Sequence, residues 1–221
     1  MKRIIGLGVE GHAAVLMELI ERAGTFESVT LLNHDDSITV RMVRGVYISG
    51  SSESIPELVK ERGLRDFFMG LSSVRTREKK RELFKYAVAC GLKPFTIAHP
   101  RAVISASAQI GKGGCILAGA IISTQTYLAE NVTVNIGAMI ESDCDIQAHV
   151  QLAGGSFVGC GARIGECSYI GTGAYLQPNV HIGDNVIIGP GAVIVEDVAD
   201  GQVVPGVYRN LPGRTDKVKP G

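Results

Sequence analysis

The sequence is poor in aromatic residues and has no tryptophan among its 221 residues. It carries no excess of either charge, because 22 lysines and arginines balance 22 aspartates and glutamates. A domain that binds nucleic acid usually shows a basic patch and a high isoelectric point. The balanced charge therefore gives no indication of nucleic-acid binding, and the scarcity of aromatics is typical of a fold packed from small side chains.

Long apolar runs and paired cysteines are also missing. The longest stretch without charged residues or histidine, 113–129, is rich in glycine, serine, threonine and glutamine, so it does not predict a membrane span. The first residues do not predict a signal peptide, because Glu10, His12 and several glycines interrupt the apolar stretch. The five cysteines form no CxxC pair. We expect reduced thiols in the cytoplasm, with neither disulfides nor a metal site.

The chain has instead a repeat of six residues between 102 and 197. The third residue of each of the sixteen units is isoleucine, leucine or valine. A period of six fits neither an α-helix nor one long strand, but it fits short strands with a corner in each unit. Glycine recurs at the fourth position, as at Gly111 and Gly171, where we expect a turn with positive φ. The repeat predicts a parallel β-helix with three faces per coil, rather than a β-sandwich with accidental periodicity.

Before the repeat, strand and helix patterns alternate from residue 1 to about 98. Strands are expected at 3–7, 28–33, 44–49, 66–71 and 95–99, and helices at 13–24, 54–62 and 75–90. This alternation predicts a small Rossmann-like domain with a parallel sheet. The chain thus divides into an α/β domain over 1–98, a β-helix over 99–210 and a polar tail over 211–221.

A glycine-rich turn joins the first predicted strand to the first predicted helix. It contains Gly8, Glu10, Gly11 and His12. Glycines at such a turn let backbone N–H groups and the helix N-terminus approach a phosphate. The second strand is followed by Asp35 and Asp36, and a carboxylate at that place often binds a ribose or a base. The pattern predicts a nucleotide site, although the two aspartates also fit a solvated turn.

In these features the chain resembles the two-domain hexapeptide acyltransferases that modify nucleotide-linked amino sugars, together with the related sialic acid O-acetyltransferases. The resemblance rests on the turn ending in Gly11 and His12, the pair Asp35 and Asp36, the hinge 99–103, the segments 135–138 and 141–144, and the turn at 206–207. It implies a left-handed β-helix and a homotrimer. It also implies acetyl-CoA in the groove between neighbouring prisms and a UDP-sugar on the N-terminal domain.

The resemblance implies roles for individual residues and implies no metal. The nucleotide sugar would contact Gly11, His12, Asp35 and Asp36, close to Gly8 and Glu10. The acetyl-CoA groove would be lined by Gln151, Gly154, Thr172, Gly189 and Val207. The catalytic segment would be Glu141, Ser142 and Asp143, with His149 one unit further along.

The usual catalytic histidine of the family is absent from this segment. The family motif Glu-His-Asp-Cys is here Glu141, Ser142, Asp143 and Cys144, and a second family histidine is replaced by Gln151. Ser142 is no base near neutral pH, so it is a substrate contact, the mark of a lost activity or an inert corner residue. His149 is either a substitute base or a surface histidine, and Asp143 could hold a water or the substrate ammonium.

We therefore expect a cytoplasmic, acetyl-CoA-dependent N-acetyltransferase that acts on a UDP-linked 4-amino-4,6-dideoxy sugar in glycan or lipopolysaccharide synthesis. An amine is a good nucleophile once it is neutral, whereas a hydroxyl acceptor would suffer more from the loss of a general base. The alternatives are an O-acetyltransferase, an enzyme with another acyl donor, or a sugar-nucleotide-binding homologue that has lost catalysis.

Overall fold

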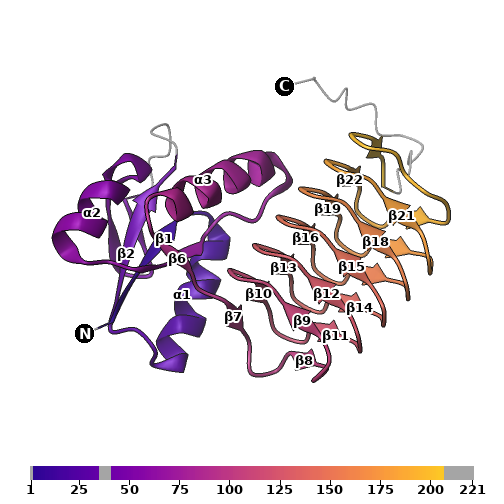
Figure 1. Ribbon diagram of the computed structural model, residues 1–221, viewed down its shortest axis with the longest axis horizontal. Helices are drawn as coiled ribbons and strands as arrows, with labels where there is room; N and C mark the ends of the chain where they lie inside the picture. Colours follow the sequence, from indigo (N-terminus) through magenta and orange to yellow (C-terminus); the bar gives the residue numbers. More distant parts are fainter. Residues whose placement is uncertain (1, 35–40, 207–221) are drawn as a thin grey trace, which may run out of the picture.

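The computed structural model describes residues 2–34 and 41–206. It consists of an α/β domain followed by a parallel β-helix, and the two domains lie side by side (Figure 1). Asp35, Asp36 and Val207, three of the predicted ligand contacts, fall outside the described residues. None of the helices in the described ranges is long and apolar enough to cross a membrane.

The N-terminal sheet has the strand order β3-β4-β2-β1-β5-β6, and only β3 and β4 pair antiparallel. Its strands are β1 (Arg3–Leu7), β2 (Ser28–Asn33), β3 (Met42–Val43), β4 (Val46–Ser51), β5 (Asp66–Met69) and β6 (Lys93–Pro94). The helices are α1 (Gly11–Ala23), α2 (Ile55–Arg62) and α3 (Arg77–Ala89), with 3₁₀ turns η1 (Ser52–Ser54) and η2 (Val74–Thr76). The chain crosses the sheet between β1 and β5, and open α/β sheets bind ligands at such a crossover.

Helices cover both faces of this sheet because alternate side chains of the central strands are apolar on both sides. On one face α1 buries Leu16 and Ile20 against Ile4 and Phe68. On the other face α2 and α3 pack in a second cluster, which includes Ile5, Leu7, Ile55, Phe67 and Phe84. The predicted Rossmann-like domain is therefore confirmed.

The β-helix consists of two-residue strands in three parallel sheets, which we name by their outward side chains and neighbours. The domain face, which lies next to the N-terminal domain, holds β7 (Ile97–Ala98), β10 (Cys115–Ile116), β13 (Thr133–Val134), β16 (Gln151–Leu152), β19 (Tyr169–Ile170), β22 (Ile187–Ile188) and β24 (Val203–Val204). The apolar face holds β8 (Val103–Ile104), β11 (Ile121–Ile122), β14 (Met139–Ile140), β17 (Phe157–Val158), β20 (Tyr175–Leu176) and β23 (Val193–Ile194). The polar face holds β9 (Gln109–Ile110), β12 (Tyr127–Leu128), β15 (Asp145–Ile146), β18 (Arg163–Ile164) and β21 (His181–Ile182).

The third residue of each unit points into the prism, as the repeat predicts. From Ile116 to Ile194 these side chains are at most 5% exposed and belong to one core cluster. Ile104 and Ile110, in the first coil, are partly buried against the same cluster. The predicted hexapeptide β-helix is confirmed, and its strands occupy the second and third positions of all sixteen units.

The role expected for the fourth-position glycines is wrong. Positive φ occurs instead at the sixth position, where Gly137 and His149 both have φ of 65°. Gly171, at a fourth position, is not among the residues with positive φ. A Cβ on Gly171 would lie 2.6 Å from the backbone carbon of Gly189 in the next coil. Close stacking of successive coils, and not turn geometry, therefore requires glycine at this position.

We expect Gly171→Ala to lower the free energy of unfolding by about 3 kcal/mol, because backbone atoms cannot move aside as a flexible side chain does. Gly137→Ala is the matched control. Nothing lies within 4 Å of a Cβ at Gly137, so only the positive φ is unfavourable and the loss is about 1 kcal/mol. Denaturant titration of both variants measures the difference, and equal losses would contradict the stacking explanation.

The strand expected over 95–99 does not belong to the N-terminal sheet. Lys93–Pro94 forms β6 and pairs with β5, whereas Ile97–Ala98 forms β7 and pairs with β10 of the β-helix. An extended pattern predicts a strand but does not identify the strand with which it pairs, and here that partner lies in the second domain. The chain therefore passes from one sheet to the other between Pro94 and Ile97.

Candidate active site

The glycine-rich turn lies at the carboxyl end of β1, where the chain crosses the sheet. Gly8 has φ of 95°, and its N–H donates to the Leu32 carbonyl at 3.0 Å. The loop after β5 packs directly on this turn, since a Cβ on Gly70 would lie 2.4 Å from the Gly8 oxygen. α1 begins at Gly11 with no acidic residue in its first turn, and a Cβ at Gly11 would meet nothing within 4 Å. The open N-terminus of α1 is suited to an anion.

Glu10 links the glycine-rich turn to the loop after β5. Its carboxylate accepts hydrogen bonds from the Ser72 N–H at 3.1 Å and from the Ser73 hydroxyl at 3.4 Å. Glu10 is one of the predicted substrate contacts, and the structure uses its carboxylate to hold the loop after β5. The negative charge is also unsuited to direct contact with a phosphate.

His12 connects the glycine-rich turn to the β-helix. It lies in the first turn of α1, and its Nε2 is 3.8 Å from the Cys115 Sγ on the domain face. Burial, together with the neighbouring Lys80 charge, lowers the pKa of His12 to about 3. The imidazole is therefore neutral at physiological pH and cannot attract a phosphate as a cation.

Glu141, Ser142 and Asp143 form the corner between the apolar face and the polar face, which we call the Ser142 corner. The Glu141 Oε2 accepts a hydrogen bond from the Cys160 N–H at 2.9 Å. The Ser142 Oγ lies 3.3 Å from the Cys160 Sγ, and Asp143 is exposed with φ of 59°. Within the described ranges no histidine or carboxylate bonds the Ser142 hydroxyl, so nothing there activates it as a nucleophile or base.

His149 lies on a different corner, between the polar face and the domain face. It is 1% exposed, and its ring packs edge-on against Phe84 of α3 with centroids 5.4 Å apart. The Asn131 side-chain amide donates to its Nδ1 at 2.8 Å. Burial, followed by the charges of Lys80, Lys85 and Arg81, lowers the pKa of His149 to about 4. The structure therefore does not bring His149 next to Ser142 within one chain, and the ring packs at the domain interface instead of lying on the surface.

The predicted acetyl-CoA contacts lie in two places, on the domain face and at the corner between the domain face and the apolar face. Gln151 is 2% exposed on the domain face, and neither atom of its amide has a hydrogen-bond partner among the described residues. Gly154, Thr172 and Gly189 lie at the corner between the domain face and the apolar face, where Thr172 is exposed. The predicted catalytic and acetyl-CoA residues thus flank the apolar face on opposite edges of one chain.

Lys80 is absent from the predicted site residues, yet it lies at the centre of the domain interface. It is 1% exposed, and its Nζ donates to the Thr133 Oγ1 at 2.7 Å and to the Asn131 carbonyl at 3.2 Å. The charged composition of α3 favours a solvated lysine, which explains why the sequence did not single it out. Its spacing of three and four residues from the buried Leu83 and Phe84 is the pattern that could have placed it on the inner face.

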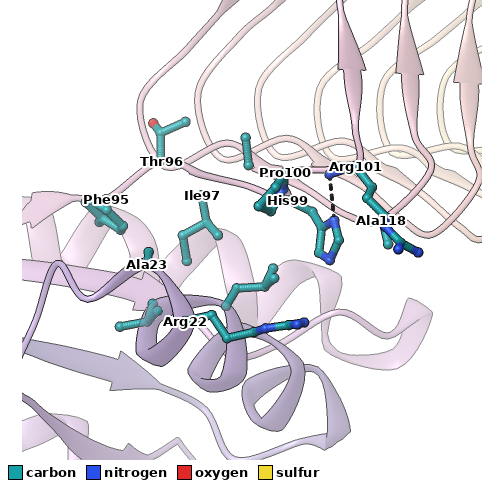
Figure 2. A pocket seen from close by; sticks show the side chains of 12 residues that line it. Arg22, Ala23, Phe95, Thr96, Ile97, His99, Pro100, Arg101 and Ala118 are labelled. Carbon is teal, nitrogen blue, oxygen red and sulfur yellow. Dashed lines mark hydrogen bonds between the residues drawn. The ribbon is translucent and has the colours of Figure 1, made fainter.

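A pocket of about 660 Å³ lies between the second half of α1 and the hinge (Figure 2). Arg22, His99 and Arg101 line it together with apolar residues such as Ile20 and Phe95. The His99 Nδ1 accepts a hydrogen bond from the Arg101 N–H at 3.0 Å. No predicted site residue lines this pocket, and the only indication of it in the sequence is the hinge segment 99–103.

Comparisons with known proteins support the assignment of both domains. Residues 161–196 match the family model for the bacterial transferase hexapeptide (six repeats). The acetyltransferase domain of PglB from Neisseria gonorrhoeae FA1090 is 32% identical, with a TM-score of 0.84, over 93% of this chain and 97% of that chain. The chain belongs to the two-domain hexapeptide-repeat acyltransferases of nucleotide-linked amino sugars. The resemblance found in the sequence is thus confirmed.

Further members of this family match the chain. GDP-perosamine N-acetyl transferase from Caulobacter crescentus, crystallised as a variant with one histidine replaced by alanine in complex with CoA and GDP-perosamine, is 29% identical with a TM-score of 0.85. That match covers 93% of this chain and 94% of that chain. GDP-perosamine N-acetyltransferase from Escherichia coli O157:H7 is 35% identical over 66 residues, so the match spans only 30% of this chain and 30% of the curated relative.

Proposed function

We propose that the protein is an acetyl-CoA-dependent N-acetyltransferase that acts on a nucleotide-linked amino sugar. The observation that carries this proposal is the match of both domains to the PglB acetyltransferase domain, which has also been solved in complex with acetyl coenzyme A. The Caulobacter crescentus relative holds CoA and GDP-perosamine together, which supports a sugar nucleotide as the second substrate.

The acceptor we propose is a 4-amino-4,6-dideoxy sugar on a nucleoside diphosphate. The family resemblance in the sequence favours UDP, whereas the GDP-perosamine relatives favour GDP. The diphosphate would lie at the N-terminus of α1, where a Cβ on Gly11 would meet nothing within 4 Å and the backbone is open. The compartment we propose is a reducing one such as the cytoplasm, where the five free thiols would stay reduced.

A homotrimer would complete the site. The apolar face presents an in-register row of outward side chains: Val103, Ile121, Met139, Phe157, Tyr175 and Val193. The two end residues, Val103 and Val193, are 62% and 65% exposed, and a continuous apolar row of this kind marks an interaction surface. A neighbouring prism packed on this face would bring its Ser142 corner toward Gly154 and Thr172 of the first chain.

The reaction would be attack of the neutral sugar amine on the thioester carbonyl. The new bond joins nitrogen to the acetyl carbon, the bond from that carbon to sulfur breaks, and CoA leaves as a thiol. Alignment of the two substrates can contribute about 7–11 kcal/mol, and backbone N–H groups at the corners can stabilise the oxyanion. A general base adds typically about 10²–10⁴-fold, so its absence from the Ser142 corner slows the reaction without abolishing it.

Release of free thiol from acetyl-CoA tests this function. We expect release with at least one UDP- or GDP-linked 4-amino sugar, and none with the same sugar nucleotide carrying a hydroxyl in place of the amine. A folded oligomer that releases no thiol with any amino sugar in the panel would overturn the proposal. That result, combined with tight binding of one sugar nucleotide, would favour the rival function of a binding homologue that has lost catalysis, which the serine at position 142 supports.

A further inference from the structure

The pocket between α1 and the hinge lies apart from both predicted substrate sites. Its volume of about 660 Å³ is within the range of about 300–1,000 Å³ typical of small-molecule sites. Arg22 lies in the last turn of α1, whereas Gly11 begins this 13-residue helix, which is about 20 Å long. Towards the predicted acetyl-CoA contacts, β16, which precedes Gly154, is three strands above β7, or about 14 Å along the prism. The pocket is therefore a separate cavity, to which neither proposed substrate is assigned.

Apolar side chains form most of the pocket wall. Leu19 and Ile20 of α1 and Ile97 of β7 line it, and each is at most 8% exposed. Phe95 is half-buried there, and its ring is held edge-on against Phe26 with centroids 4.9 Å apart. A wall of this kind suits a ligand with an apolar body.

Basic side chains complete the lining. Arg22 enters from α1, whereas His99 and Arg101 enter from the hinge (Figure 2). No aspartate or glutamate is among the twelve lining residues, all of which belong to the described part of the chain. Arg22 pairs with Glu18 at 3.8 Å, but both side chains are at least 50% exposed. Such a surface pair is weak, so the Arg22 guanidinium remains available to a ligand.

The His99 ring is fixed as a hydrogen-bond donor towards the pocket. Its Nδ1 accepts the Arg101 N–H at 3.0 Å, so the ring hydrogen of the neutral form is on Nε2. The protonated form also carries a hydrogen on Nε2. Figure 2 shows the ring pointing from the hinge towards α1, with Nε2 on the side away from the hinge. His99 therefore offers a donor in either charge state.

The Ala98 N–H is a further donor at the same wall. Ala98 lines the pocket and belongs to β7, which pairs only with β10 and is the edge strand of its sheet. The N–H groups of Ile97 and His99 donate to carbonyls of the second coil at 2.9 and 2.8 Å. Because alternate residues of a strand direct their N–H groups to opposite sides, the Ala98 N–H points out of the sheet. Unpaired edge groups of this kind are available to a ligand.

We propose that this pocket is a binding site for a small organic phosphate, additional to the two substrate sites. Arg22, Arg101 and the His99 Nε2–H would hold the phosphate, and the apolar body of the ligand would lie on Phe95. Guanidinium groups match phosphate oxygens in charge and geometry. The donors come from a helix, a hinge and a strand edge, which suits a tetrahedral anion better than a planar carboxylate. The site does not depend on acetyl transfer.

The probe for this site is 1-naphthyl phosphate, which joins a flat apolar ring to a phosphate. The chain contains no tryptophan, so naphthyl fluorescence can be titrated without tryptophan emission. We expect saturable binding of one molecule per chain. 1-Naphthol lacks the phosphate, and inorganic phosphate, used as a competitor, lacks the ring. Each should bind at least about tenfold more weakly than the probe.

Two variants alter the pocket in different ways. Arg22→Gln combined with Arg101→Gln should raise the Kd of the probe by at least about tenfold, because both guanidinium groups are lost. Ala23→Phe keeps both charges but places a ring in the pocket, since the exposed Ala23 lines it, and should weaken binding by a similar factor. Arg62→Gln is the matched control, because Arg62 is an exposed arginine in the last turn of α2. Its Kd should equal that of the wild type.

Gly11→Glu distinguishes the pocket from the diphosphate site. A Cβ at Gly11 meets nothing within 4 Å, so this variant places a carboxylate at the N-terminus of α1 without a clash. We expect the Kd of the probe to stay unchanged. Loss of binding in Gly11→Glu, an unchanged Kd in both pocket variants, or equal binding of 1-naphthol would each overturn the inference, as would a wild type that does not bind the probe. Failure of acetyl transfer would reject the proposed function and leave this measurement unaffected.

Discussion

Replacement of Ser142 by histidine is expected to raise kcat by about 10²-fold near neutral pH, the lower end of what a general base supplies. The position is half-buried at an outer corner, so the larger ring has room toward solvent. The neighbouring Glu141 carboxylate is already held by the Cys160 N–H at 2.9 Å, and a carboxylate beside an imidazole raises its basicity.

Thr124→His is the matched control for this variant. Thr124 occupies the equivalent position one coil earlier on the same edge of the prism, and it is exposed. A histidine there adds the same ring without placing it at the catalytic corner, so kcat should stay at the wild-type level. An equal gain from both variants would show that the ring acts nonspecifically. Activity in the Ser142→His protein with an inactive parent would identify the parent as a homologue that has lost catalysis.

Met139→Glu is expected to convert a trimer into monomers and to lower activity to about one hundredth or less. Met139 lies in the middle of the apolar row and is 37% exposed in the single chain. A carboxylate buried there without a partner would be strongly unfavourable. Activity would fall with assembly, because the Ser142 corner and the predicted acetyl-CoA residues flank this face and meet only across two chains. Light scattering would show the mass fall from three times 23.4 kDa to 23.4 kDa.

Tyr127→Glu provides the control for the interface prediction. Tyr127 is 44% exposed on the polar face, so the substitution adds the same charge to another face of the same prism. We expect this variant to remain trimeric and active. A wild-type protein that is monomeric at the concentrations used in the assay, or a Met139→Glu protein that stays trimeric, would contradict the proposed assembly.

The β-helix could be predicted almost residue by residue, because a strict period of six leaves one arrangement for the third-position side chains. Ile140, Ile146 and Leu152 are each at most 1% exposed, as that arrangement requires. Features that depend on contact between distant segments could not be predicted in the same way. Glycine is needed at the fourth position because the backbone of the next coil lies too close for a Cβ. The extended segment near residue 97 pairs with β10, which belongs to the second domain.

The candidate site was predicted less completely, because it too depends on contacts between segments that are distant in the sequence. The glycine-rich turn can be recognised because its residues are contiguous, and the structure places it at the sheet crossover. His149 is one unit from Ser142 in sequence, but each unit turns a corner, so the two side chains lie on different edges of the prism. Lys80 and Thr133 are 53 residues apart, and no local pattern reports that their side chains meet.

The most direct test of the central claim is the mass and linkage of the product formed from acetyl-CoA and a nucleotide-linked 4-amino sugar. We predict that the sugar nucleotide gains one acetyl group on nitrogen, in a linkage that resists hydroxylamine, with an equal amount of CoA released. Recovery of the sugar nucleotide unchanged, or of a product whose acetyl group hydroxylamine removes, would contradict N-acetyl transfer by this protein.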